Sequence, residues 1–267
     1  MARRIVDLSV TLEDKPMELE GHRPEIKYFG HTDPASIKAF ENYFPGVPIS
    51  VLPDGVAWQS ERISLNSHAG THMDAPLHYH PTTDHAVVPG GRPSPGIDAV
   101  PLDLCFQPGV KLDFRKFDAG YVVTADDVKD ELTRIGHTLK PAEIVLINTR
   151  AGDMYGRPGY FDAHIGIGRE ATLFLLNKGI RVVGTDGFGW DAPFGSMAER
   201  YKQTGDASII WEGHKAGREI GYFQMEKLCN LETLPATGFE VVCFPIKIKD
   251  ASAGWVRAIA IFEERGG

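Results

Sequence analysis

Apolar positions along the chain follow two patterns that predict β-strands. Arg4–Val10 alternates between apolar and polar residues, as a strand with one buried face does. Glu143–Thr149 is an almost continuous apolar run rich in β-branched residues, which is typical of a strand covered on both faces. Arg181–Thr185 has the same character. Further strands are expected at Glu61–Ser67, Gly109–Asp113, Glu240–Phe244 and Trp255–Phe262.

Two segments carry the end signals of helices. Thr124 can cap a helix that runs to about Ile135, because Asp127 stands three residues later, as in a capping box. A second helix is expected over Arg169–Lys178, and Gly179 can end it in the left-handed conformation that glycine accepts. Since strands and helices are mixed along the chain, the fold class is α/β or α+β.

Between about residues 13 and 56 the pattern changes to frequent prolines with aromatic residues between them. This composition predicts a long proline-rich arm with one short helix near Asp33–Phe44. Arms of this length usually cover a site or a partner. We therefore expect a single domain over residues 1–267 with an extended arm at about 13–56.

Composition and charge limit the function classes. The chain has 267 residues, of which 42% are hydrophobic, enough for one sizeable core. Its net charge of −8 disfavours nucleic acids and anionic membranes as partners, because both require a basic face. No apolar run approaches the roughly 18 residues needed to span a bilayer. No apolar segment follows Arg3 and Arg4, so no signal peptide is expected.

The three cysteines, Cys105, Cys229 and Cys243, are odd in number and show no Cys-x-x-Cys spacing. They imply neither a disulfide framework nor a thiolate zinc site. A reducing, cytoplasmic location is therefore expected.

Histidines are concentrated in one short stretch of the chain. Five of the ten fall within 18 residues, at positions 68, 72, 78, 80 and 85. Neutral imidazoles close to a carboxylate form a site for a divalent metal such as Zn²⁺, Mn²⁺ or Fe²⁺. The clustering therefore indicates a metal-dependent enzyme.

His68, His72 and Asp74 are the candidate metal ligands. Gly70 and Pro76 argue against a helix here, and in extended backbone His72 and Asp74 project to the same side. Gly70 would let the chain bend so that His68 reaches the same point. Two imidazoles and one carboxylate fill about half of a coordination shell, and such an open site suggests catalysis rather than a structural role.

His78 is expected beside the metal as a proton carrier, because an imidazole titrates near neutral pH. His80 and His85 are interpreted as surface residues or as residues that support the ligands from outside.

The run His68-Ala-Gly-Thr-His72-Met-Asp74-Ala-Pro-Leu-His78 contains the pattern His-x-Gly-Thr-His-x-Asp-x-Pro-x-His. This pattern resembles the signature of the cyclase family of metal-dependent hydrolases, which includes bacterial kynurenine formamidases and isatin hydrolases. The strands expected at Arg4–Val10 and Glu143–Thr149, the segment Arg181–Asp191 and the C-terminal block from Thr237 also look like recurring blocks of the family.

The resemblance implies that His68, His72 and Asp74 bind the metal and that His78 is the acid/base. It also points to a His followed twelve residues later by a Glu, which in this chain are His214 and Glu226. In the formamidases this pair, with the bridging Asp, completes a second metal site. In the isatin hydrolases one manganese is bound, and the equivalent His acts in catalysis. His214 is therefore a catalytic candidate, and Glu226 is a candidate ligand.

The family further implies an α/β fold, namely a swivelling β/β/α domain, and a homodimer or higher homo-oligomer. In the family the arm of one subunit helps to close the pocket of its neighbour. The length of the chain and its arm look closer to the isatin hydrolases than to the formamidases.

Two other patterns in the sequence bear on ligand binding. Gly166-Ile-Gly168-Arg-Glu-Ala171 matches a dinucleotide-binding pattern, with Asp186 about 20 residues later, but these glycines do not follow directly on a strand. A loop that ends in a helix start is the preferred interpretation. Phe188 and Trp190 follow the strand at Arg181–Thr185, and loops at such strand ends often line ligand sites.

Phe188, Trp190 and, from the arm, Phe44 are therefore candidate contacts for a small aromatic substrate. The preferred function is hydrolysis of a C–N bond in an aromatic amide or cyclic amide by a Mn²⁺ or Zn²⁺ enzyme, with an isatin-like lactam as the favoured substrate. An arylformamidase acting on N-formylkynurenine and a lactone or carbamate hydrolase remain open. Two His and one carboxylate also form the facial triad of non-haem iron oxygenases. A non-catalytic metal-binding module is the third alternative.

Overall fold

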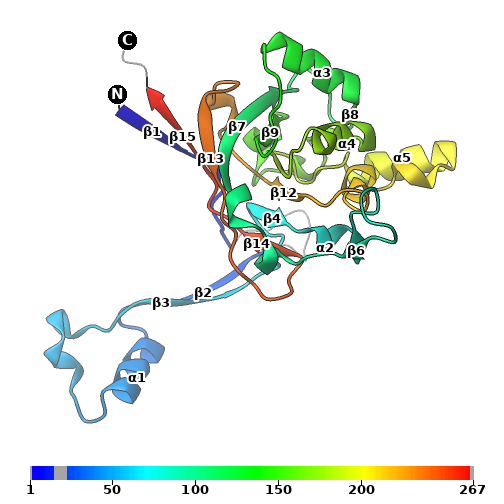
Figure 1. The fold of residues 1–267 in the computed structure, drawn as a ribbon. Coiled ribbons are helices and arrows are strands. Elements are labelled where there is room, and N and C mark those ends of the chain that lie inside the picture. The colour runs from blue at the N-terminus through cyan, green and yellow to red at the C-terminus, as the bar shows by residue number, and fades with distance from the viewer. Residues whose placement is uncertain (1, 15–22, 265–267) are drawn as a thin grey trace. The chain divides into compact units, whose positions relative to one another are not determined.

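A computed structural model describes residues 2–14 and 23–264 of the chain. The chain divides into two compact units, and each is described here by itself. The larger unit contains the described residues up to Thr11 and those from Ser67 onward, and the smaller unit runs from Leu12 to Asn66 (Figure 1).

The larger unit is built on one mixed sheet. Among the described residues its strand order is β1-β15-β13-β7-β9-β11-β12-β4-β14, with β7, β9, β11 and β12 parallel to one another. The other neighbours pair antiparallel. In that order the strands are Ala2–Asp7, Ile259–Glu264, Phe239–Val242, Phe106–Asp113, Ile144–Asn148, Val182–Thr185, Phe223–Glu226, His72–Asp74 and Ala253–Trp255.

The sheet curls back on itself. Only residues 256–258 separate β14, which ends the strand order, from β15, which is second from the other end. Three residues span at most about 10 Å when fully extended, so the two ends of the sheet must lie close together. Ser9, just after β1, also forms a bridge to Leu228, just after β12. The segment predicted as one strand over 255–262 is therefore two strands, because the chain changes sheet neighbours within it.

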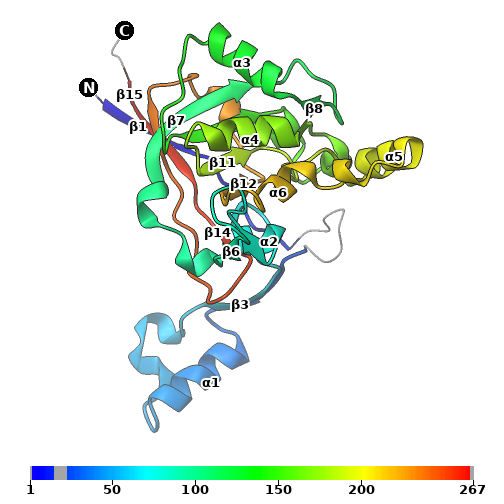
Figure 2. The same cartoon turned by 45° about the vertical axis from the view of Figure 1, so that its right-hand side comes forward.

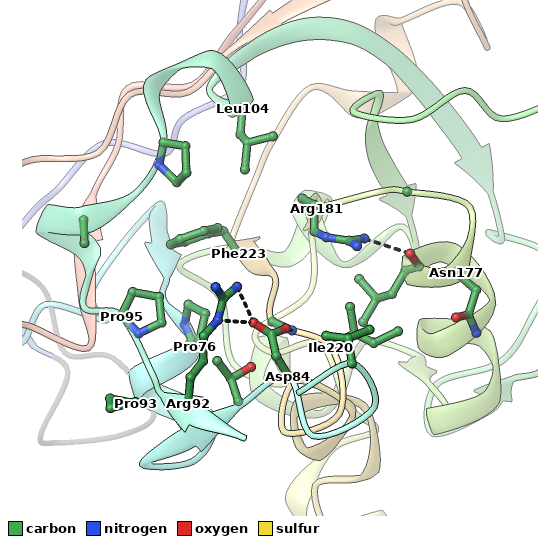
Figure 3. Close-up of a pocket in the computed structure, with 17 residues that line it drawn as sticks. Pro76, Asp84, Arg92, Pro93, Pro95, Leu104, Asn177, Arg181, Ile220 and Phe223 are labelled. Carbon is green, nitrogen blue, oxygen red and sulfur yellow. Dashed lines mark hydrogen bonds and ion pairs between the residues drawn. The ribbon is translucent and has the colours of Figure 1, made fainter. Parts of the chain in front are cut away.

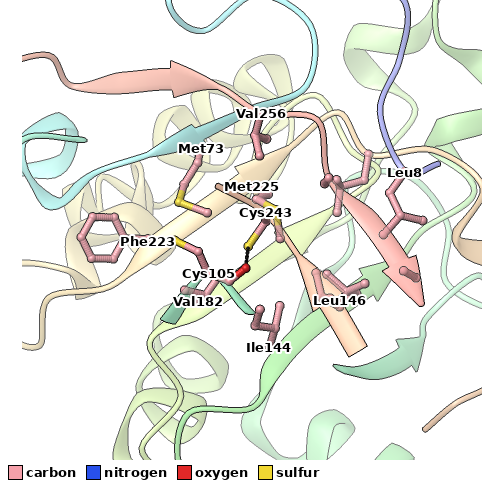
Figure 4. Close-up of a cluster of buried hydrophobic side chains, with 14 of the residues drawn as sticks. Leu8, Met73, Cys105, Ile144, Leu146, Val182, Phe223, Met225, Cys243 and Val256 are labelled. Atoms are coloured by element: carbon pink, nitrogen blue, oxygen red, sulfur yellow. Dashed lines mark hydrogen bonds between the residues drawn. The ribbon is translucent and has the colours of Figure 1, made fainter. Parts of the chain in front are cut away.

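Both faces of the central strands are buried. In β9, Ile144 and Leu146 belong to one core, whereas Val145 and Ile147 belong to the other. The first core lies between strands of the curled sheet, with Leu8, Met73 and Met225 among its members (Figure 4). Helices cover the second core. This alternation explains why β9 reads as a continuous apolar run, and it confirms the predicted doubly covered strand.

The helices that cover the second core are α3 (Ala125–Arg134) and α4 (Arg169–Asn177); Figure 2 shows both on the same side of the sheet. Thr124 and Asp127 form the predicted capping box, each side chain accepting the other's backbone N–H. Gly179 follows α4 with φ +87°, the left-handed conformation predicted for it.

Among the described residues, this unit also has three further α-helices and four strands of two residues each. The helices are α2 (Pro76–Tyr79), α5 (Phe194–Thr204) and α6 (Glu212–Ala216), and the small strands are β5 (Thr82–Thr83), β6 (Arg92–Pro93), β8 (Val122–Val123) and β10 (Gly166–Ile167). None of the described helices has the length and apolar character needed to cross a membrane.

The smaller unit consists of a hairpin and a helix. Strands β2 (Glu25–Phe29) and β3 (Ser60–Ser64) pair antiparallel, and helix α1 (Pro34–Tyr43) begins after the N-cap Asp33. Phe40 is buried within the unit and contacts the ring of Trp58. The short helix predicted near 33–44 is confirmed, but the segment around it folds on itself and is not simply extended. Strand β3 pairs with β2 and not with the large sheet. The domain boundaries given above stay predictions.

Gly166 has a packing role that explains the dinucleotide-like pattern. A Cβ at this position would lie 2.1 Å from the backbone N of Ala192, which leaves no room for any side chain. Strand β10 runs along this loop, where Ile167 donates its N–H to the carbonyl of Trp190. Asp186 accepts hydrogen bonds from the N–H and hydroxyl of Thr149. The glycine thus serves close backbone approach, as the loop interpretation expects.

We predict that Gly166→Ala destabilises the fold, because the new methyl group meets backbone atoms that cannot rotate away. The expected loss is about 2–3 kcal/mol in the free energy of unfolding. Urea unfolding followed by circular dichroism measures it. Gly195→Ala is the matched control, since nothing lies within 4 Å of its Cβ position in α5. Equal stabilities of the two variants would contradict this account.

Candidate metal centre and active site

The register of two paired strands places four polar side chains on one face of the sheet. His72 lies opposite Glu226, and Asp74 lies opposite Gln224, in the antiparallel pairing of β4 with β12. Directly opposite residues project to the same face, and so do residues two apart on one strand. The intervening pair, Met73 and Met225, points the other way into the first core (Figure 4).

His68 reaches the same point from the turn before β4. Gly70 has φ +60°, a conformation that glycine adopts without strain, so the expected bend is present. Nδ1 of His68 lies 2.8 Å from Oδ1 of Asp74, and Nε2 of His72 lies 3.2 Å from the same oxygen. The structure therefore brings the three predicted ligands together around one carboxylate.

The buried polar atoms of Asp74 and His72 show that the site suits a cation. Asp74 and His72 are completely buried, yet both carboxylate oxygens of Asp74 and Nε2 of His72 lack a hydrogen-bond partner in the described structure. Nδ1 of His72 lies 2.9 Å from the carbonyl oxygen of Gly70, so Nδ1–H donates there and Nε2 keeps its lone pair. Unpaired buried polar groups cost free energy, and a divalent cation would satisfy all three atoms.

Asp74 is shared by two groups of side chains that could hold a metal ion. One is His68, Asp74 and His78; the other is His72, Asp74 and Glu226; within each, the ligand atoms lie within 4.8 Å of one another. The donor set of imidazoles and carboxylates suits Zn²⁺, Mn²⁺ or Fe²⁺.

His78 and His214 approach the second oxygen of Asp74 from different sides. Nε2 of His78, on α2, lies 3.9 Å from Oδ2, and Nε2 of His214, on α6, lies 3.8 Å from it. The side chain of His78 is 23% exposed, whereas that of His214 is 4% exposed. His78 can therefore exchange protons with solvent, and His214 is sealed inside the site.

Asp191 orients His214. Its carboxylate accepts the backbone N–H groups of Gly213 and His214 at the start of α6, at 2.6 and 3.1 Å, and it also accepts Nδ1–H of His214. The ring is further stacked on Trp211, with 4.5 Å between centroids. Nε2 of His214 is thereby directed at Asp74 and Glu226.

The two histidines have opposite pKa shifts in the metal-free site. Burial lowers the pKa of His78 to about 4, with the charges of His214 and His68 acting in the same direction. Burial also lowers the pKa of His214, but the carboxylates of Asp191, Asp74 and Glu226 outweigh it, and the pKa lies well above its usual value. Burial raises the pKa of Asp74, but His72 and the neighbouring imidazoles bring it well below the usual range.

Glu226 differs from Asp74 because one of its oxygens, Oε1, accepts hydrogen bonds. Oε1 accepts the side-chain amide of Gln224 at 2.6 Å and the backbone N–H of Trp190 at 3.2 Å. Oε2 lies 3.8 Å from Nζ of Lys227. Burial and Asp74 raise the pKa of Glu226, but His214 and Lys227 outweigh them and bring it to about 2.

The candidate aromatic contacts have different environments. The indole of Trp190 is completely buried in the second core and donates its N–H to Thr172, so it packs the fold and faces no open surface. Phe188 is 8% exposed and lies under the ammonium of Lys227 at 4.3 Å. Phe44 is 48% exposed in the smaller unit, and its role stays a prediction.

His80 and His85 do not contact Asp74, and both interact with a residue that lies between them. Nδ1 of His80 and Nε2 of His85 both contact the hydroxyl of Thr82. A cavity of about 660 Å³ lies beyond them at the opposite ends of β11 and β12, beside Arg181 and Phe223 (Figure 3). Its arginines are satisfied within the chain, Arg92 by Asp84 and Arg181 by backbone carbonyls. The cavity therefore shows no unmet polar group like those of Asp74.

A family model described as a putative cyclase matches residues 6–192, well over half of the chain. The chain belongs to the cyclase family. A kynurenine formamidase of Erythrobacter litoralis is 29% identical over 198 residues, which cover 74% of each chain. An isatin hydrolase of Roseibium aggregatum is 27% identical over 222 residues, which cover 78% of this chain and 76% of the relative.

The fold agrees with the family. The crystal structure of an isatin hydrolase bound to the product analogue thioisatinate superimposes with a TM-score of 0.74 and 22% identity, covering 98% of this chain and 93% of that one. The predicted α/β cyclase fold, with its curled sheet, is thus confirmed. The family includes hydrolases, the class that the sequence predicts for this chain.

Three residues of the site were not found from the sequence. Asp191 was read only as part of a loop, and neither Gln224 nor Lys227 carries a pattern of its own. Each meets the site through a strand pairing or a contact with another segment of the chain. The one signal that could have found Asp191 is its place in the loop that follows the buried strand β11.

We predict that Asp191→Asn lowers the pKa of His214, because it removes the hydrogen-bonded carboxylate that raises that pKa most. Proton NMR titration of the histidine ring signals in metal-free protein measures the change. Asp162→Asn, at an exposed position, is the control and should leave the His214 titration as it is. An unchanged His214 pKa in Asp191→Asn would contradict the assigned role of Asp191.

Proposed function

We propose that the protein is a metal-dependent amidohydrolase that cleaves the C–N bond of an aromatic amide or cyclic amide. The observation that carries the proposal is the set of three buried atoms without partners, both oxygens of Asp74 and Nε2 of His72. A site that leaves a carboxylate unpaired in the interior is explained by a cation that the fold is built to receive.

His68, His72 and Asp74 would hold the ion, and Mn²⁺ or Zn²⁺ fits this donor set. When bound, the ion would supply Lewis acidity, which activates water and polarises a carbonyl oxygen. The protein side chains supply the remaining steps.

His78 and His214 divide the proton transfers. Nε2 of His78 faces Asp74 at 3.9 Å and is partly open to solvent, so His78 is placed to take the proton of the attacking water. The water oxygen adds to the carbonyl carbon, and the C–N bond then breaks. His214, held by Asp191, is placed to give a proton to the leaving nitrogen or to orient the oxyanion.

An isatin-like lactam is the preferred substrate. The isatin hydrolase relative and the superimposed isatin hydrolase both support this choice. N-formylkynurenine is the second candidate, because a kynurenine formamidase matches the chain at similar identity. A lactone or carbamate would suit the same chemistry. A cytoplasmic homodimer stays the expected form of the protein.

Oxygen activation is the alternative from another reaction class, since two His and one carboxylate also serve non-haem iron enzymes. His78 and His214 beside the ligands favour proton transfer. Oxygen uptake with Fe²⁺ would support the alternative, whereas turnover with Mn²⁺ or Zn²⁺ without oxygen would exclude it.

The proposal is tested by metal analysis of the purified protein, followed by assays with isatin and N-formylkynurenine. We expect bound Mn²⁺ or Zn²⁺, loss of turnover after chelation and recovery on adding metal. Asp74→Asn should lose the metal itself, because it removes the shared anionic ligand. His80→Ala is the matched control and should keep metal and turnover. Full activity after exhaustive chelation would refute the proposal.

We predict that His78→Ala keeps the metal but loses turnover on the order of 10²-fold or more, since it removes the base without removing a ligand. Metal content by plasma mass spectrometry and kcat with the active substrate measure the two effects separately. Loss of both metal and turnover would make His78 a ligand, and loss of neither would remove it from the mechanism.

A further inference from the structure

The side-chain amide of Gln224 fills the space between His214 and Glu226. Its Nε2 lies 3.0 Å from Nε2 of His214 and 2.6 Å from Oε1 of Glu226. All three side chains are buried. A metal ion held by His214 and Glu226 would need to stand about 2.0–2.2 Å from each ligand atom. The amide nitrogen stands within hydrogen-bond distance of both ligand atoms, so it competes with a metal ion for them.

The orientation of the amide is fixed by its neighbours. Oε1 of Gln224 lies 3.0 Å from the hydroxyl of Tyr222, which can donate to it. Turning the amide over would place its oxygen against the carboxylate of Glu226 at hydrogen-bond distance, which is repulsive because neither group could donate. The NH₂ group therefore faces Glu226.

Lys227 supplies a second obstruction from the chain itself. Its side chain is 1% exposed, and Nζ donates to the carbonyl of His68 at 3.0 Å while lying 3.8 Å from Oε2 of Glu226. The backbone at Lys227 has φ +56°, which L-residues rarely adopt. The unusual conformation aims the ammonium back into the site.

Asp74 and Glu226 are thus treated differently by the fold. Neither oxygen of Asp74 makes a hydrogen bond, and only imidazole nitrogens lie near them. Oε1 of Glu226 accepts the Gln224 amide and the Trp190 N–H, and the Lys227 ammonium lies 3.8 Å from Oε2. A carboxylate with its donors already in place gains little from a metal, and the nearby ammonium would repel one.

We propose that Gln224 and Lys227 close the second metal position, so that the protein binds one divalent ion and Glu226 serves as the counter-charge of Lys227. The inference rests on the proposed function only in requiring the first ion at His68, His72 and Asp74. The side-chain amide of Gln224 and the ammonium of Lys227 form the obstruction, and hydrogen bonds hold both groups. Glu226 then fixes the amide of Gln224, whose nitrogen lies 3.0 Å from Nε2 of His214.

The test is the number of metal ions bound per chain. The full-length protein is titrated with Mn²⁺, and bound ions are counted by native mass spectrometry and by plasma mass spectrometry after desalting. Wild type should stop at one ion. The double variant Gln224→Ala with Lys227→Gly should take a second ion at least about 10²-fold more tightly than wild type does. Glycine suits the positive φ at 227.

Two controls separate obstruction from general disturbance. Gln224→Leu keeps the bulk without the N–H and should stay at one ion. Lys111→Met removes another buried ammonium, which donates to the carbonyl of Leu234 away from Asp74, and should also stay at one ion. A second ion in either control would show that the count does not depend on this obstruction.

Electron paramagnetic resonance of Mn²⁺ gives a measurement on wild type that needs no variant. A single-ion spectrum at excess metal is expected, and an exchange-coupled pair would overturn the inference.

Two ions bound by wild type would overturn this inference and leave the proposed function standing. If wild type bound no ion, the proposed metal-dependent function would itself be refuted. A folded double variant that still binds one ion would remove Gln224 and Lys227 from the explanation.

Discussion

The buried carboxylate of Asp74 is the constraint around which this site is organised. It stands on a strand with no exposed surface, and neither of its oxygens receives a hydrogen bond. Desolvating a carboxylate costs several kcal/mol unless charge and donors compensate for it. Four imidazoles at 2.8–3.9 Å provide only part of that compensation. A cation bound at the carboxylate of Asp74 would therefore be favoured electrostatically.

The curled sheet makes such a point possible. Strand β4 lies between β12 and β14, so the backbone groups of Asp74 are used by strand pairing and its side chain is left for the site. The opposite face of the same strand places Met73 in the core between the ends of the sheet. A rigid, doubly buried strand holds ligands more exactly than a loop does, which a metal site with open positions requires.

The groups around the candidate metal ligands give the site three separate roles: a proton acceptor, a proton donor and a counter-charge. The side chain of His78 is partly open to solvent, whereas His214 is held by Asp191 and Trp211. Glu226 lies beside the ammonium of Lys227 and accepts the amide of Gln224. The same kinds of residue, histidine and carboxylate, thus take different roles because their second partners differ. This is the general way in which proteins set acid, base and ligand functions apart.

Several elements and the candidate metal ligands could be predicted from the sequence because they depend on local patterns. The capping box at Thr124, the glycine that ends α4 and the doubly covered strand β9 depend on neighbours within a few residues. The cluster from His68 to His78 lies within one turn, one short strand and one short helix, so its convergence on Asp74 followed from spacing and from the bend at Gly70.

Only the tertiary structure decided the rest. The pairings of β4 with β12 and β14, and of β1 with β15, join segments more than 100 residues apart, and no local pattern specifies their register. The sequence predicts Trp190 as a substrate contact, but its side chain is buried in the second core, because helices cover the strand before it. Gln224 and Lys227 matter only because that register sets them beside His214 and Glu226.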